Sequence, residues 1–139
     1  MKFLTKNLVI HSVIFLIASF LFRYLISWSL ISEYFNGVWI VAAAYFVSVF
    51  VLTWWFSILD KEQLPYYDVG FRFHLATFVI WLLVSHLWFA YGKLSPHEHI
   101  IQLHISSAIW AVFVLIHFVA FWVTRKNAIK GLKKTDLFE

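Results

Sequence analysis

The sequence contains no cysteine, which excludes disulfide bonds, thiolate zinc sites, iron–sulfur clusters and the covalent attachment of c-type haem. Any metal or cofactor must therefore be held by histidine, carboxylate, tyrosine, methionine or backbone groups. The chain has only two prolines and four glycines, so the broken helices typical of transporters are not indicated. It also lacks Gly-rich phosphate loops and the Gly-x-Ser-x-Gly and His-Glu-x-x-His motifs. No motif names a reaction, and enzymatic activity is left open.

Charged residues are scarce as well. They make up 13% of the 139 residues, whereas 63% are hydrophobic and the mean hydropathy is +0.82. A soluble domain of this length cannot bury so much apolar surface. One membrane-spanning helix needs about 20 apolar residues, and the sequence has four such stretches, at roughly 8–32, 36–59, 69–91 and 99–124. With short connections between them, they predict an all-α integral membrane protein, a single-domain four-helix up-down-up-down bundle over 1–139.

The distribution of lysine and arginine predicts the orientation. Nine of the ten that lie outside the helix centres fall on one side of the predicted membrane, and only Lys93 falls on the other. Because cytoplasmic loops are enriched in these residues, we expect both termini in the cytoplasm, in a bacterial inner membrane. We interpret the basic tail 125–139 as a topology signal beside anionic lipid, with a docking helix for a partner as the alternative. The net charge of +4 is explained by orientation, so nucleic acid is not an expected partner.

Histidine is unusually frequent inside the predicted spans. Ionisable groups at membrane depth are costly and suggest function, although a single histidine can simply bond a neighbouring helix. In an antiparallel hairpin, the residue numbers of two partners at equal depth add up to the same total along the whole hairpin. This sum is 191 for one pair and 190 for the other, so the sequence predicts an inner pair near the cytoplasmic side and an outer pair near the opposite side. The inner pair is His74 with His117, and the outer pair is His86 with His104.

Helical rotation places the two pairs on different faces. Their separations of 12 and 13 residues turn the side chains by about 120° in one helix and about 140° in the opposite sense in the other. The two histidines of each pair can converge on one bound group, and the two bound groups would lie on opposite faces of the hairpin. Two imidazoles that approach iron from opposite sides are what bis-histidine ligation of haem b needs.

On these four histidines, residues 69–124 resemble membrane b-type cytochromes, which stack two haems across the bilayer between histidine pairs. The resemblance implies a small haem-b-binding electron-transfer subunit, with His74 and His117 on one iron and His86 and His104 on the other. The spacing departs from the 13–14 residues that familiar members often use. If the resemblance holds, Arg23, which lies at about the depth of the outer pair, is placed to meet a haem propionate.

Two alternatives stay open. In the first, the chain is a non-catalytic membrane subunit or assembly factor whose histidines only tie helices together. In the second, His97 and His99, flanking Glu98 in the loop before the last helix, form an outer-face metal site with the outer pair. The spacing of these loop histidines does not give the i, i+4 arrangement that brings two ligands together on a helix. Besides lipid, we expect a membrane protein partner or a second copy of the chain.

Overall fold

A computed structural model describes residues 4–60, 66–92 and 94–131, with the side chains of 66–68 and 125–131 left out. Within these ranges the chain forms four helices: α1 (Lys6–Ile31), α2 (Phe35–Asp60), α3 (Tyr66–Tyr91) and α4 (Ile100–Gly131). All four are long and apolar enough to cross a membrane. The predicted all-α membrane fold is confirmed, and each predicted span coincides with one helix to within a few residues at most ends.

One boundary differs from the predicted span. Helix α4 continues to Gly131, seven residues past the expected end at 124. Lysine and arginine are good helix formers, and nothing between 125 and 131 forbids a helix. The first part of the predicted basic tail is therefore helical in its backbone, and the remainder, 132–139, lies outside the described residues.

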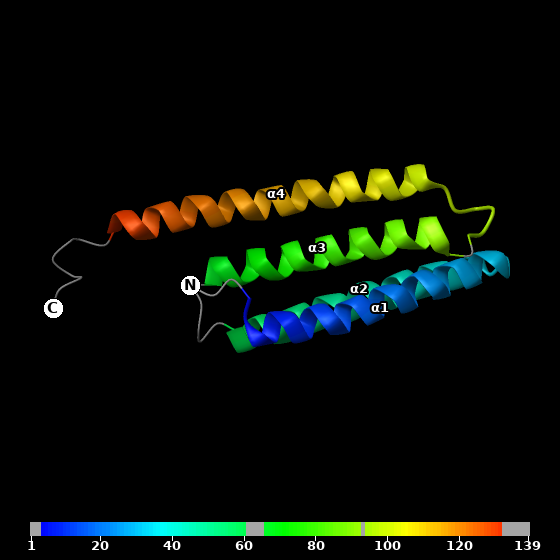
Figure 1. Cartoon of the computed structure of the whole chain (residues 1–139), viewed down its shortest axis with the longest axis horizontal. Coiled ribbons are helices and arrows are strands. Elements are labelled where there is room, and N and C mark those ends of the chain that lie inside the picture. The colour runs from blue at the N-terminus through cyan, green and yellow to red at the C-terminus, as the bar shows by residue number, and fades with distance from the viewer. Residues whose placement is uncertain (1–3, 61–65, 93, 132–139) are drawn as a thin grey trace.

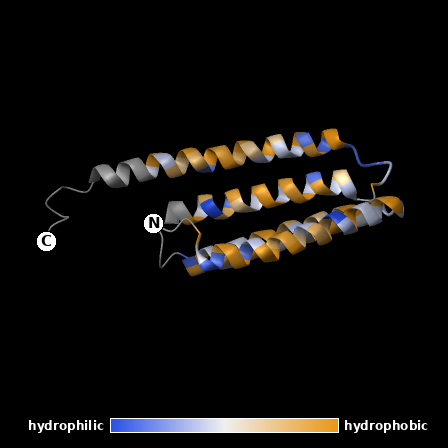
Figure 2. Ribbon diagram, in the orientation of Figure 1, coloured by the Kyte–Doolittle hydropathy of each residue, from blue (hydrophilic) through white to orange (hydrophobic). Residues whose placement is uncertain are grey.

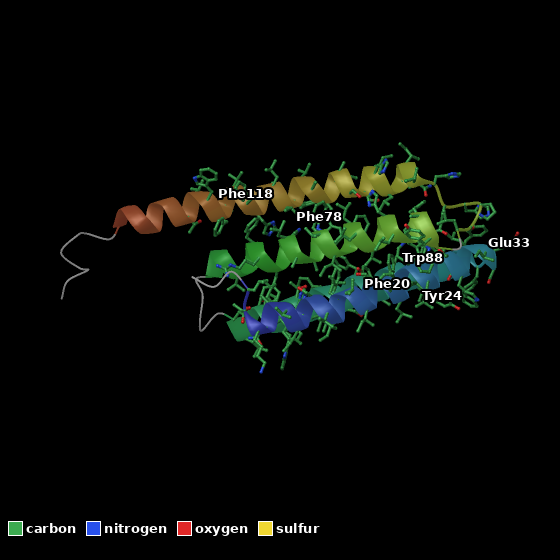
Figure 3. The ribbon with its side chains drawn as sticks, in the orientation of Figure 1. Phe20, Tyr24, Glu33, Phe78, Trp88 and Phe118 are labelled. Atoms are coloured by element: carbon green, nitrogen blue, oxygen red, sulfur yellow. The ribbon has the colours of Figure 1, made fainter. Side chains whose placement is uncertain are left out.

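The ends of α1 are set by local hydrogen bonds. Thr5 caps the start, where its hydroxyl accepts a hydrogen bond from the Leu8 N–H at 3.1 Å. At the other end the chain turns sharply, because the Tyr34 N–H donates to the Ser29 carbonyl at 2.8 Å and Glu33 adopts a left-handed φ of 55°. Glu33 lies at this turn in Figure 3. The tight connection makes α1 and α2 antiparallel neighbours.

The helices alternate in direction but do not surround a common axis equally. Helix α1 packs against both α2 and α3, and α2 also touches α3. Within the described residues, α4 makes its helix–helix contacts with α3. Figure 1 shows α4 along one side of the molecule, with α3 between it and the α1–α2 pair; the start of α1 and the end of α4 lie at the same end. The fold is thus a three-helix unit with a fourth helix attached to one of its members.

The interior of this fold is polar. Nine polar or charged residues are buried in the described part, against eight hydrophobic ones, so apolar burial does not dominate the core. Many large apolar side chains are exposed instead, and Figure 2 shows hydrophobic colour along the described parts of the helices. This inverted pattern fits a bilayer, where lipid covers apolar side chains and polar side chains bond between helices. The architecture fits an integral membrane protein.

Polar contacts join α1 to α2 along their length. At one end the Asp60 carboxylate accepts hydrogen bonds from Thr5 and, at 2.7 Å, from the Asn7 amide. Asp60 is 1% exposed, so this carboxylate at the end of α2 is buried in the bundle although its position in the sequence is interfacial. The sequence placed it correctly at a helix end but could not show that the start of α1 covers it. Deeper in the bundle, the Ser19 and Tyr45 hydroxyls lie 2.9 Å apart.

Candidate functional site

The α3–α4 hairpin brings the four histidines together as two pairs. The ring centroids of His74 and His117 are 4.5 Å apart, and those of His86 and His104 are 5.8 Å apart. Partners that touch across the hairpin must lie at matched depth, so the pairing predicted from the sums of residue numbers is confirmed. We keep the names inner pair and outer pair for these two sets.

The two rings of the inner pair lie close together, and one of them is hydrogen-bonded to a neighbouring tryptophan. The Trp110 indole N–H donates a hydrogen bond to Nε2 of His74 at 2.9 Å, which uses the lone pair of that nitrogen. Nδ1 of His117 lies 2.9 Å from the Phe113 carbonyl oxygen, one turn earlier on α4. Phe78, between α3 and α4 in Figure 3, contacts Trp110 from the other side. His74 therefore already has a structural partner.

This contact gives a testable expectation for the hairpin. Replacing Trp110 with Phe keeps most of the aromatic packing but removes the N–H donor to His74. We expect the free energy of unfolding in detergent to fall by about 0.6–2 kcal/mol, the range of interhelical hydrogen bonds in membranes. Trp122→Phe is the matched control, because Trp122 is 59% exposed and packs edge-on against Phe118. Equal losses in both variants would show that the hydrogen bond contributes nothing of its own.

The outer pair has a more open geometry. Nδ1 of His86 lies 2.8 Å from the Leu82 carbonyl, so the proton belongs on Nδ1 and the lone pair of Nε2 is left for another partner. His104 makes no hydrogen bond to any residue that the structure describes. Both side chains are exposed, and their ring planes are inclined by 24°. A hydrogen bond from one ring nitrogen to a carbonyl is the usual way in which proteins orient a metal-binding histidine.

The two pairs lie on different sides of the hairpin. Trp81 follows His74 by seven residues, about two helical turns, so both share a face of α3. That face borders a cavity between α1 and α4, which Trp81 lines. His86 is rotated by about 140° from Trp81 and so faces away from the cavity. The predicted placement of the pairs on opposite faces agrees with this geometry.

Arg23 has an acidic partner of its own. One of its terminal nitrogens donates to Oε1 of Glu98 at 3.2 Å, and the two side chains are only 12% and 6% exposed. The other oxygen of Glu98 accepts from the Ser27 hydroxyl at 2.7 Å and from the Ser95 N–H at 3.0 Å. The carboxylate beside Arg23 is thus supplied by the chain itself, where the sequence suggested a haem propionate.

The same network includes Trp88, whose indole N–H donates to the Ser27 hydroxyl at 2.9 Å. Figure 3 shows Trp88 near the end of α3, close to α1. The guanidinium carbon of Arg23 also lies 5.2 Å from the centroid of the Phe89 ring. The network therefore ties α1, α3 and the loop before α4 into one cluster at the outer end of the bundle, the end that holds the 32–34 turn.

The predicted outer-face metal site is not assembled. His97 packs edge-on against Phe35, with ring centroids 5.4 Å apart, and His99 is exposed in the loop. Glu98, the carboxylate between them, is engaged by Arg23. Among the described residues, no group of three histidine, aspartate or glutamate side chains converges to hold a metal ion. The loop folds back toward α1, and this separates the histidines from their predicted carboxylate partner.

Ligation of one iron by two histidines requires a certain distance between the ring centroids, and the two pairs differ in that distance. Two bonds of about 2 Å from metal to nitrogen, plus half of each ring, place the ring centroids about 6 Å apart. The outer pair, at 5.8 Å, fits this spacing, and the Leu82 carbonyl orients one of its rings. The inner pair, at 4.5 Å, is too close, and its His74 nitrogen is bonded to Trp110. The ring spacing of the outer pair is compatible with two nitrogen ligands of one iron, and the ring spacing of the inner pair is shorter than that.

Comparison with known proteins does not assign the chain to a family. No protein-family model, curated protein or solved structure matches it. The geometry of the outer pair and the polar cluster around Arg23 are therefore the features that bear on function.

Sequence reasoning did not find the role of Glu98. The sequence indicates this residue only as a metal-site carboxylate between two histidines. The available signal was Arg23 itself, because a guanidinium within a membrane span requires an acidic partner. Only Glu33 and Glu98 lie at that end of the predicted bundle. Glu33 lies in the short turn after α1, whereas Glu98 lies in the longer loop before α4, which can fold back toward Arg23.

Proposed function

We propose that the protein is a small membrane electron-transfer subunit that binds haem b at the outer pair. The observation that carries this proposal is the spacing of His86 and His104, 5.8 Å between ring centroids, together with the hydrogen bond that leaves Nε2 of His86 available. The two histidines come from different helices, so they can approach an iron from opposite sides. Haem, when bound, supplies one-electron chemistry, and the protein supplies the axial ligands and their orientation.

Absorption spectroscopy of the purified protein tests this proposal directly. We expect the protein, expressed with haem available and purified in mild detergent, to carry about one haem per chain. Reduction with dithionite should give the sharp bands of six-coordinate haem b. A preparation that stays without these bands after haem is added to the detergent-solubilised protein would rule out the proposal.

The exposed position of the outer pair supports the proposal of a protein partner. Both imidazoles lie on the surface of the hairpin at membrane depth, where polar groups facing lipid are costly. A bound macrocycle would cover the rings with apolar surface, and a neighbouring subunit or a second copy would cover the macrocycle. Electron transfer in turn requires a donor and an acceptor, so we expect the haem to face such a partner.

We further propose that both termini lie in the cytoplasm of a bacterial cell. Support comes from the excess of lysine and arginine toward the end of the bundle where α1 begins and α4 ends. Fusion of alkaline phosphatase to either terminus should give inactive reporter, and fusion of a fluorescent protein should give signal. Insertion of the phosphatase after Ser95, in the loop before α4, should restore activity. Active phosphatase at either terminus would contradict this orientation.

A second function has its own support. His74 is bonded to Trp110, and Nε2 of His11 lies 3.2 Å from the Thr53 hydroxyl, so two of the histidines within the spans already join elements of the bundle. A non-catalytic subunit or assembly factor would use histidine only in this way. The outer pair separates the two proposals, because among the described residues neither of its histidines makes a hydrogen bond to another helix. A haem-free protein of undiminished stability would favour the second function.

A further inference from the structure

A cavity of about 320 Å³ lies at the outer end of the bundle, on the face of the hairpin opposite the outer pair. Its walls come from all four helices and from the loop before α4. This size is at the lower limit of small-molecule sites, which suits a head group more than a whole lipid. The cavity exists because α4 packs on α3 and leaves a space toward α1 and α2. Its lining includes Arg23, Ile26, Val38, Trp81, Glu98 and Gln102.

Arg23 supplies hydrogen-bond donors to this cavity. A guanidinium has five N–H groups, and the structure shows one of them bonded, to Glu98. The Nε–H is buried without a hydrogen-bond partner among the described residues, and the side chain, which is 12% exposed, lines the cavity. Gln102 contributes a side-chain amide from α4. A bound molecule is therefore expected to present a hydrogen-bond acceptor.

The charge balance favours an uncharged ligand. Glu98 already neutralises Arg23, and both of its oxygens are satisfied within the protein. An anion bound beside the guanidinium would be repelled by this carboxylate at short range and low dielectric. A carbonyl oxygen accepts hydrogen bonds without adding charge. The apolar part of the lining, with Ile26, Val38 and Trp81, suits the hydrocarbon body of the same molecule.

The depth of the cavity agrees with a molecule that arrives through the membrane. Arg23 lies eight residues before the end of α1, about 12 Å below it, and a helix of 26 residues is about 39 Å long. A hydrocarbon core of about 30 Å leaves the last few ångströms of α1 in the interfacial region. The long arginine side chain can reach toward that region. The cavity therefore spans the boundary where lipid ester carbonyls are found.

We propose that this cavity binds an uncharged, membrane-soluble carbonyl compound, whose carbonyl oxygen accepts hydrogen bonds from Arg23 and Gln102. The carbonyl is that of a lipid ester or of an alkylated ring ketone, and both share the same acceptor chemistry. This site is independent of haem at the outer pair, because the two lie on opposite faces of the hairpin. Binding therefore persists even in a protein that carries no haem.

Photo-crosslinking tests the proposal. The full chain in nanodiscs is labelled with a diacylglycerol that carries a diazirine next to one ester, and labelled peptides are located by mass spectrometry. We expect labels on the cavity walls at Ile26–Leu30 and Gln102–Ser106. Unlabelled diacylglycerol should displace the probe, whereas the dialkyl ether of the same chain length, which lacks only the carbonyls, should not. Displacement at a lower concentration of an alkylated benzoquinone than of diacylglycerol would assign the site to a ring ketone, and the reverse order would assign it to a lipid ester.

Variants of the cavity provide the matched comparison. Arg23→Lys keeps the charge that pairs with Glu98 but loses the fork of donors, and we expect labelling to fall about tenfold or more. Val38→Phe fills the cavity and should abolish labelling, with Arg23 intact. Ile105→Phe introduces the same aromatic side chain on an exposed part of α4 and should leave labelling unchanged. Equal displacement by ester and ether lipids, or labelling that Val38→Phe does not change, would overturn the proposal.

Discussion

His104→Leu is expected to give a protein without haem, whereas His117→Leu is expected to retain the full haem content. Leucine is compatible with a membrane helix and fills similar space, so each variant should insert and fold. The first substitution removes one of the two axial ligands that we propose at the outer pair. The second removes a residue of the inner pair, whose rings are too close for an iron and whose His74 is bonded to Trp110.

The two variants are compared by the ratio of reduced-haem absorbance to protein, after both have been shown to elute as folded protein. His86→Leu should behave like His104→Leu, since it removes the opposite ligand. If His117→Leu were the one variant of the three that lost haem, the iron would lie at the inner pair and our assignment would be contradicted. Equal partial loss in all three would instead indicate a haem at each pair, as the resemblance to b-type cytochromes implied.

Glu98→Ala is expected to lower the free energy of unfolding by about 3–5 kcal/mol, the cost of removing one partner of a buried ion pair. The substitution leaves the Arg23 guanidinium at membrane depth without its carboxylate. It also removes the acceptor for the Ser27 hydroxyl and the Ser95 N–H. Unfolding of the detergent-solubilised protein with increasing sodium dodecyl sulfate, followed by circular dichroism, measures the change.

Two further variants separate charge from hydrogen bonding. Glu98→Gln keeps an acceptor for Ser27 and Ser95, so it should lose less stability than Glu98→Ala. In the double variant Arg23→Met with Glu98→Ala, no charge is left buried, and much of the lost stability should return. A loss below about 1 kcal/mol in Glu98→Ala would mean that the pair behaves as an exposed one, and it would contradict the burial described above.

Much of the fold was predictable from the sequence, because lipid imposes simple requirements. A span needs a minimum length of apolar residues, so the four helices followed from composition and run length. The depth of the histidine pairs also followed, because a short loop fixes the register of an antiparallel hairpin. His74 met His117, and His86 met His104, without any adjustment of that register.

The details of the site were less predictable, because they depend on side chains that fold back across the chain. Periodicity could not show that Trp110 would donate to His74 and so occupy a predicted iron ligand. Nor could it show that Glu98 would turn toward Arg23, 75 residues earlier in the chain. The same holds for Asp60, whose burial depends on Thr5 and Asn7 at the adjacent start of α1, more than 50 residues earlier in the chain.

The attachment of α4 to α3 has a consequence for biogenesis. Because synthesis is vectorial, α1, α2 and α3 enter the membrane before α4 has left the ribosome. Their mutual contacts do not involve α4, so these three helices can settle as a unit while the remainder is still being translated. Until the loop that carries Glu98 leaves the ribosome, the guanidinium of Arg23 lies in the membrane without its carboxylate partner. A ribosome stalled when α3 has entered the membrane but the loop that carries Glu98 has not yet emerged should therefore leave a nascent chain that membrane quality-control proteases recognise.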